Sequence, residues 1–333
     1  MSVTRRRFLL TTVAGALAGP LIAGALPERK RVGWLLPEQK FFALDPFRRR
    51  LRELGWAEGD SLTIEQRYAA GDRGRYMSLA ADLVRLKADV LVTDGSAATA
   101  AAQRATTTIP IVFVSGNPVG QGFVASLSHP GRNLTGVAIL TGELMPKRVQ
   151  LLKEMATGMT RLAMVEDLTA VGLAVAPNDA RLGGNWQAIE TAARDVGVQL
   201  APTIEIHTPT ELDRAFALAL QEHANGVLLL ASPFFSSRNR QLVAQAGETR
   251  LPAIYEHRGF VEAGGLMSYG PDHRAIFRLV AQYVDKILRG ARPSDLPVEQ
   301  PTGLELVINA KTARTLGLAI PPSLLARADQ IIQ

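Results

Sequence analysis

Short apolar runs alternate with segments of helical composition along most of the chain, and the clearest case lies between residues 88 and 136. The run 90–93 ends in Asp-Gly-Ser. An Ala-rich segment follows, without a helix breaker before Ile109-Pro110, and a second β-branched run, 111–115, ends at Gly116-Asn117-Pro118. Strand, helix and strand in this order predict a βαβ unit with parallel strands.

The same alternation continues on both sides of this unit. Two runs of strands and helices at this interval predict an α/β fold with two doubly wound parallel-sheet lobes, joined near 136–143. Between Met164 and Trp186, both L-A-M-V-E-D and V-G-L-A-V-A-P-N-D could form the strand. The other predicted strands are 31–36, 61–68, 134–140, 161–165, 199–206, 226–230, 253–255, 265–269, a short one around Val298, and 306–309. The other predicted helices are 47–54, 76–86, 143–155, 186–196, 209–222, 238–246, 272–289 and 310–316.

The first residues have the pattern of an export signal. Three arginines, Arg5 to Arg7, precede an apolar run, 8–26, that ends near Ala23-Gly24-Ala25. Paired arginines before Phe8-Leu9 are typical of the twin-arginine variant, and we expect cleavage after Ala25 and a periplasmic product. An uncleaved membrane anchor is the alternative, because about nineteen apolar residues almost span a bilayer. A lipoprotein anchor is excluded, since no cysteine follows.

Composition narrows the function classes. The chain has 333 residues, 47% hydrophobic and 20% charged, which indicates a well-packed protein of more than one ordinary domain. It has no cysteine, so thiol catalysis, disulfides and cysteine-ligated metals are impossible. The formal charge of +6 falls to +3 without the three signal arginines, and the basic residues are scattered. This balance gives poor support for a nucleic-acid partner.

Motifs of catalysis are missing. The sequence contains no G-x-S-x-G, Walker loop, G-x-G-x-x-G, H-E-x-x-H or EF-hand loop. None of the five histidines is paired at metal-ligand spacing; they are His129, His207, His223, His257 and His273. We therefore expect neither an enzyme nor a metal or cofactor.

The predicted strands end in small, polar or aromatic residues. The carboxyl ends of parallel strands lie at the edge of the sheet where open α/β proteins hold ligands, and two facing sheets would bring them together in one cleft. For a single aromatic residue, core packing is an equally good explanation. The candidate polar contacts are Ser96, Ser115, Asn117 and Ser232, the candidate walls are Phe41, Phe234 and Tyr255, and the remaining candidates are Gly95, Ala97, Gly116, Pro233 and Glu256.

The turn at Gly95-Ser96-Ala97 has the strongest pattern of these strand ends. It would lie at the N-terminus of a helix, where free N–H groups and the positive end of the dipole favour an anion. Small side chains let a ligand approach the backbone. The alternative is purely structural, with Asp94 or Ser96 as an N-cap and the glycine as a turn residue.

Several stretches of the chain resemble the periplasmic substrate-binding proteins of ABC transporters related to tryptophan- and tyrosine-binding components. The resemblance covers nearly all of the chain after the signal. It is carried by L-R-E-L-G-W-A-E-G-D at 51–60, I-P-I-V-F-V-S-G-N-P-V-G-Q-G-F-V-A-S-L-S-H-P-G-R-N-L-T-G at 109–136, P-V-E-Q-P at 297–301 and L-V-I-N-A-K-T-A-R-T-L-G-L-A-I-P-P-S-L-L-A-R-A-D at 306–329.

The resemblance implies a type I periplasmic-binding fold, with two lobes, three crossovers and a solute in the cleft between the lobes. We expect residues 26–138 plus 265–290 in the N-terminal lobe and 139–264 plus 291–333 in the C-terminal lobe, with a hinge near Gly136, Gly264 and Gly290. In relatives that bind amino acids, the positions equivalent to Gly95-Ser96-Ala97 and Ser115-Gly116-Asn117 line the cleft.

One position departs from the family pattern. Relatives usually have Asp-Pro-Val where this chain has Asn117-Pro118-Val119. An amide cannot form the bond between two opposite charges that a carboxylate forms with an ammonium group, so for an α-amino acid the negative charge would have to come from Glu256 or Asp94.

The function expected from these observations is that of a monomeric exported receptor, which closes on a small organic solute and delivers it to an ABC permease in the inner membrane. The solute would be an amino acid or a related aromatic or amide compound. The alternative is a periplasmic sensor module that uses the same cleft and signals to a receptor kinase.

Overall fold

A computed structural model describes residues 29–37, 43–70, 72–139, 141–169 and 186–333. In this part of the chain no helix is long and apolar enough to cross a membrane. The predicted export signal, the candidate wall Phe41 and the second candidate strand between 164 and 186 lie outside the described residues. Because Arg161–Asp167 forms β6, the L-A-M-V-E-D segment is a strand of the second sheet.

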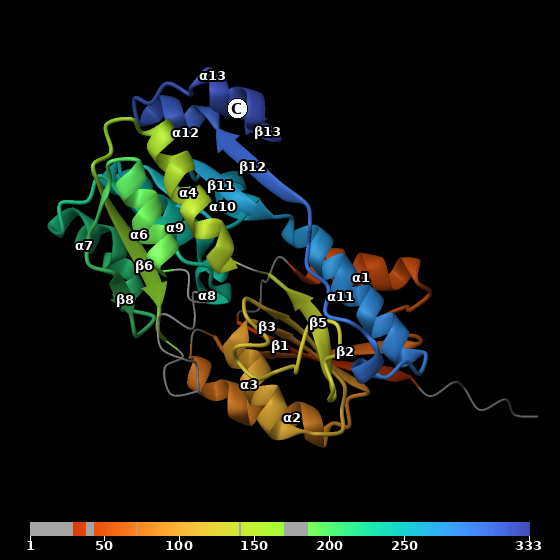
Figure 1. Ribbon diagram of the computed structural model, residues 1–333. Coiled ribbons are helices and arrows are strands. Elements are labelled where there is room, and N and C mark those ends of the chain that lie inside the picture. The colour runs from red at the N-terminus through yellow and green to blue at the C-terminus, as the bar shows by residue number, and fades with distance from the viewer. Residues whose placement is uncertain (1–28, 38–42, 71, 140, 170–185) are drawn as a thin grey trace, which may run out of the picture.

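Lobe 1 is built around a fully parallel sheet with the order β2-β1-β3-β4-β5 (Figure 1). Its Val-, Ile- and Leu-rich strands are buried because helices cover both faces, as parallel sheets require. The strands are β1 (Lys30–Leu36), β2 (Leu62–Tyr68), β3 (Val90–Asp94), β4 (Ile111–Ser115) and β5 (Leu134–Ala138). The helices are α1 (Leu44–Glu53), η1 (Arg73–Arg75), α2 (Tyr76–Arg85), α3 (Ser96–Ala105), α11 (His273–Leu288) and η3 (Pro293–Asp295).

Lobe 2 contains a larger sheet with the order β13-β12-β11-β10-β9-β6-β7, and β8 also pairs with β6. Its strands are β6, β7 (Gln199–Leu200), β8 (Ile204–Ile206), β9 (Gly226–Leu229), β10 (Ala253–Tyr255), β11 (Met267–Pro271), β12 (Leu304–Asn309) and β13 (Gln330–Ile332). Its helices are α4 (Thr141–Met155), α6 (Trp186–Asp195), η2 (Glu211–Arg214), α7 (Ala215–Gln221), α8 (Pro233–Ser237), α9 (Asn239–Thr249), α10 (Arg258–Glu262), α12 (Ala310–Thr315) and α13 (Pro322–Arg327).

The second sheet differs from the predicted parallel sheet at one edge. Strand β12 runs antiparallel to β11, from Met267 opposite Ile308 to Pro271 opposite Leu304, and β13 is parallel to β12. The reason is topological: the chain reaches β12 directly from lobe 1, without a covering helix in lobe 2 that would reverse its direction.

The chain passes between the lobes at 139–140, at Asp272 and at 300–303, so the three predicted crossovers are present. Two of them lie elsewhere than expected, because β11 is an inner strand of the second sheet and Val298 packs in the core of lobe 1. Residues 265–271 therefore belong to lobe 2 and residues 291–299 to lobe 1. Gly264 precedes β11 within lobe 2, and Gly290 ends α11 within lobe 1.

Helix α11 belongs to lobe 1 although it directly follows β11, a strand of lobe 2. It packs on α1 and on β3, β4 and β5, with Phe277, Val280 and Val284 buried in the same core as Trp34. Figure 1 shows α11 in blue beside the red α1, below the blue and green elements of lobe 2. The crossover at Asp272 thus joins the second sheet directly to a core helix of the first lobe.

Candidate functional site

The strand ends of lobe 1 bring two hydroxyl groups together. Gly95 has φ = 83° and donates its N–H to the carbonyl of Val114 at 2.8 Å, which ties the end of β3 to the end of β4. Ser96 begins α3, and its Oγ lies 3.5 Å from Oγ of Ser115. The first turn of this ten-residue helix therefore faces small polar side chains, and Ala97 beside it is buried.

The loop after β4 uses the Asn117 side chain for its own turn. Asn117 Oδ1 accepts a hydrogen bond from the Gly120 N–H at 2.9 Å, and Ser115 donates to Gln121 Oε1 at 3.4 Å. A carboxylate could accept that backbone hydrogen bond as well, so the turn itself does not require an amide. Gly116 and Asn117 are half-buried beside the strand ends.

In lobe 2, Ser232 holds the start of α8 and the end of β6 together. Its Oγ accepts from the N–H groups of Phe234 and Phe235, as an N-cap does, and donates to Oδ2 of Asp167 at 2.5 Å. The other oxygen of Asp167 accepts from the backbone and hydroxyl of Thr169. Pro233 fits the first helical position because that N–H needs no partner there.

Glu256 follows β10 and is buried beside α8. Its carboxylate accepts from Ser236 Oγ at 2.5 Å and from the Ser232 N–H. Burial raises the pKa of this carboxyl group to about 7, although these two hydrogen bonds and the charge of Arg148 act in the opposite direction. The group is thus poised between its neutral and charged forms near neutral pH.

His257 is part of the same polar cluster. Its Nδ1 accepts the Gly259 N–H at 3.0 Å as the N-cap of α10, so in the neutral ring Nε2 carries the proton and donates to Ser236 Oγ at 3.2 Å. Its ring lies 4.3 Å from that of His273, centroid to centroid. Burial lowers the pKa of His273 to about 3 and also lowers that of His257, which keeps both rings neutral.

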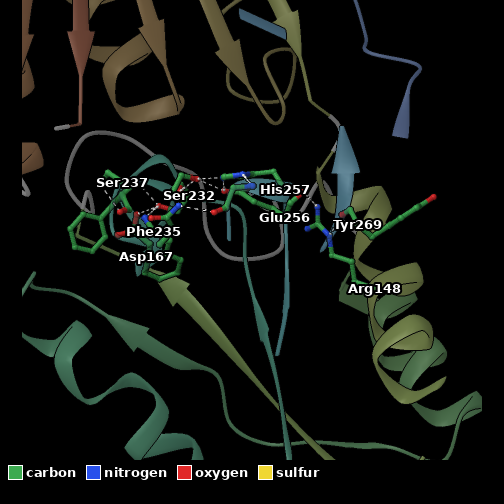
Figure 2. A network of polar contacts seen from close by, with 12 residues as sticks. Arg148, Asp167, Ser232, Phe235, Ser237, Glu256, His257 and Tyr269 are labelled. Atoms are coloured by element: carbon green, nitrogen blue, oxygen red, sulfur yellow. Dashed lines mark hydrogen bonds and ion pairs between the residues drawn. The ribbon is translucent and has the colours of Figure 1, made fainter. Parts of the chain in front are cut away.

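Arg148 extends the polar cluster toward the crossover at Asp272. The side chain is fully buried, and its Nε donates to the Tyr269 carbonyl at 2.7 Å while Nη2 donates to the Glu256 carbonyl at 3.4 Å. Burial lowers its pKa to about 10, so the guanidinium is still charged at neutral pH. Figure 2 shows the labelled side chains from Asp167 to Arg148 as a row, with elements of lobe 1 above them.

The two lobes touch at predicted site residues. A Cβ atom built on Gly95 of lobe 1 would lie 2.8 Å from Cγ of Pro233 in lobe 2, closer than side-chain atoms approach. The strand ends of the two sheets therefore face each other across a close contact, with Ser96 and Ser115 on one side and Ser232 on the other.

Two predicted wall residues belong to the core of lobe 2 instead. Tyr255 is fully buried, stacks on Phe260 at 4.6 Å between ring centroids, and lines a pocket with Leu251 and Leu316 near the opposite ends of the strands. Phe234 is 1% exposed and packs in the same core cluster. The alternation of side chains along β10 explains Tyr255, because successive residues point to opposite faces.

The candidates predicted from the sequence leave out four polar residues of this cluster, Arg148, Asp167, Ser236 and His257, although His257 directly follows the candidate Glu256. A signal existed for Arg148, because it falls between Met145 and Leu152 on the apolar face of its predicted helix. A charged residue at such a position is a candidate for a specific buried role. No comparable spacing marks Ser236 or His257. In the described residues, no group of histidines and carboxylates could hold a metal ion.

Comparison with known proteins agrees with the fold. The family model described as "ABC transporter substrate binding protein" matches residues 42–332. A tyrosine-binding protein of Clostridioides difficile is 23% identical over 277 residues, which are 82% of this chain and 75% of that protein.

Solved structures give the same result. A conserved domain protein of Vibrio cholerae superposes with a TM-score of 0.78 at 27% identity, covering 91% of this chain and 99% of that one. A Streptococcus pneumoniae ABC domain in complex with L-Trp has the same TM-score at 22% identity, covering 91% and 100%. A solute-binding protein of Thermotoga lettingae in complex with 5-methylthioribose has a TM-score of 0.59 at 17% identity, covering 90% and 97%.

These neighbours are type I periplasmic-binding proteins, with two parallel-sheet lobes as in this chain. Members of the matched family are extracytoplasmic solute-binding components of importers and are not enzymes. On the family match over most of its length, together with the fold, this chain belongs to the ABC transporter substrate-binding protein family.

Proposed function

We propose that this protein binds an amino acid, or a related aromatic or amide compound, between its two lobes and delivers it to an ABC permease in the inner membrane. The observation that carries the proposal is the facing pair of polar strand ends that meet at Gly95 and Pro233. The names of the tyrosine-binding relative and of the complex with L-Trp support the solute class.

The two sides of the contact have complementary chemistry for an amino acid. On the lobe 1 side, the start of α3 with Ser96 and Ser115 favours a carboxylate, because unpaired helix N–H groups and hydroxyls donate to it. On the lobe 2 side, Asp167 is the last residue of β6 and Glu256 follows β10, and these two carboxyl groups favour a positive group. Glu256 can therefore supply the charge that Asn117 lacks. We keep Gly95, Ser96, Ala97, Ser115, Gly116, Asn117, Ser232, Pro233 and Glu256 as proposed contacts.

The proposal includes export. Arg5 to Arg7 before the apolar run support a twin-arginine signal, cleavage after Ala25 and action in the periplasm. We propose that the exported chain acts there as a monomer. These residues precede the region matched by the family model.

A thermal-shift screen tests the solute. The chain from Leu26 onward would be heated with amino acids, aromatic acids and small amides. A solute at a hundredfold excess over its Kd adds about 2.7 kcal/mol to the free energy of unfolding. We expect a clear rise in Tm with an aromatic amino acid, and no rise in a Ser96→Trp variant, whose indole would fill the space between the lobes.

Two results would narrow or contradict the proposal. Hits confined to uncharged or purely anionic compounds would exclude an amino acid and leave a related aromatic or amide compound as the solute. An equal rise in Tm for Ser96→Trp and the unmodified chain would place the solute elsewhere than between the strand ends.

A further inference from the structure

Arg148 connects the polar edge of lobe 2 to a crossover. Its guanidinium holds the carbonyl of Glu256, at the end of β10, and the carbonyl of Tyr269, near the end of β11. Only Gly270, Pro271 and Asp272 separate Tyr269 from α11. Since α11 packs in lobe 1, one buried side chain links the candidate solute site to the path between the lobes.

Gly270 shows how tightly the two strand ends are pressed together. A Cβ atom on Gly270 would lie 2.0 Å from the Glu256 carbonyl oxygen and 3.1 Å from Nη2 of Arg148. Any side chain at this position would separate β11 from the Glu256 carbonyl and break the contact to Arg148. The chain therefore contacts the Glu256 backbone of the candidate site at the point where it leaves β11 for the crossover.

A second route leads from the same carboxylate to α11. The Glu256 side chain accepts from Ser236, Ser236 accepts from His257, and the His257 ring lies against His273, the first residue of α11. Arg274 beside it forms an ion pair with Glu262 of α10 at 2.8 Å. The first turn of α11 is thus held to lobe 2 by contacts that begin at Glu256 and at α10.

We propose that Arg148 and His257 are positioning residues for solute binding, which couple the Ser232–Ser236–Glu256 edge of the cleft to the crossover at 270–273. A solute that contacts this edge would change the hold of lobe 2 on α11 and so bias the angle between the lobes. The inference rests on the proposed function only where it names the solute as the molecule that acts on this coupling. The contacts that couple the edge to the crossover are present in the chain itself.

Hydrogen exchange of the solute-free chain, read by mass spectrometry, tests the coupling. Ser236→Ala removes the hydroxyl that joins Glu256 to His257, yet Ser236 is two contacts away from α11. We expect amides 274–278 in the first turns of α11 to exchange roughly three- to tenfold faster in this variant, because His257 loses its hydrogen bond to Ser236 and holds His273 less firmly. Arg148→Lys, which cannot hold both carbonyls in the same geometry, is expected to have the same effect.

Ser237→Ala is the matched control, because Ser237 lies on the same short helix but, among the residues that the structure describes, donates only within that helix, to the Phe234 carbonyl at 2.7 Å. It should leave amides 274–278 unchanged. If Ser236→Ala speeds exchange only around 232–240, or if both serine variants affect α11 equally, the coupling is wrong. Either result would leave solute binding untouched, since that is read from the thermal-shift screen.

Discussion

At the residue scale, Glu256 combines burial with a position at the end of a strand that faces lobe 1. On burial its carboxyl group loses hydration and gains two hydrogen bonds and a nearby guanidinium. The loss of hydration outweighs these interactions, so the protonated form is favoured more in the protein than in water. Because burial raises the pKa of this carboxyl group from its ordinary value of 4.5 to about 7, its stabilising contribution is complete below pH 4.5 and is lost as pH rises through 7.

Glu256→Gln should therefore change how stability depends on pH. The amide keeps an acceptor for Ser236 and Ser232 but cannot ionise. Relative to the unmodified chain, we expect the variant to gain on the order of 2 kcal/mol in the free energy of unfolding between pH 5 and pH 8. Urea unfolding at both pH values measures this. His257 and His273 lose their contributions to stability toward low pH in both proteins, so these contributions cancel when the variant is compared with the unmodified chain. If the two proteins differ by the same free energy of unfolding at pH 5 and at pH 8, the raised pKa of Glu256 is refuted.

Sequence patterns at the residue scale predicted which strand ends meet, but not which side chain does what. Ser96, Ser115 and Ser232 lie at the facing edges as expected. Tyr255 and Phe234 were wrong as walls because the direction of a side chain depends on its place in the pleat and on core packing. Arg148 acts through carbonyls that are distant in sequence, and no local pattern reveals such partners.

At the element scale, α8 is a single short turn of helix between β9 and α9, so few backbone hydrogen bonds hold it. Its start depends on Ser232, which caps two backbone N–H groups and also binds Asp167. This single hydroxyl therefore ties the start of α8 to the end of β6, beside the strand pairing of β6 with β9.

Ser232→Ala should therefore lower the free energy of unfolding by about 1–2 kcal/mol, as expected for loss of an N-cap with a buried partner. Ser78→Ala is the control, because its exposed hydroxyl donates only to the Arg75 carbonyl on the surface of α2. It should change stability by less than about 0.5 kcal/mol. Denaturant unfolding compares the two variants, and equal losses would mean that the Ser232 contacts contribute nothing special.

Elements were predictable where apolar periodicity is strong. The strands 90–94 and 111–115 and the long helix 273–288 lie within a residue of the predicted bounds. The end of the chain was harder: α13 and β13 in the proline-marked tail are short, and β13 forms only by pairing with β12. The run at Val298 packs in the core of lobe 1 and forms no strand in the structure.

At the scale of the whole molecule, the domain boundaries depend on which sheet each segment joins. Gly264 and Gly290 were reasonable sites for a hinge because glycine often marks a change of direction. In the structure each is an ordinary turn glycine within a single lobe, Gly264 in lobe 2 and Gly290 in lobe 1. The pairing of β11 with β10 and β12 decides the boundary, and long-range pairing of this kind is not encoded in local sequence.

In the proposed function, a solute is held between lobes that come together at Gly95 and Pro233. We would measure the affinity of Gly95→Ala for the solute that raises Tm most by titration calorimetry, and compare it with the affinity of the control variant Gly55→Ala for the same solute. Both glycines have positive φ, 83° and 95°, so both substitutions introduce similar backbone strain, on the order of 1 kcal/mol. Only the methyl group on Gly95 would meet Pro233, because nothing lies within 4 Å of a Cβ on Gly55. We predict at least about tenfold weaker binding for Gly95→Ala, equivalent to about 1.4 kcal/mol, and unchanged affinity for Gly55→Ala. Equal affinities for the two variants would contradict the account.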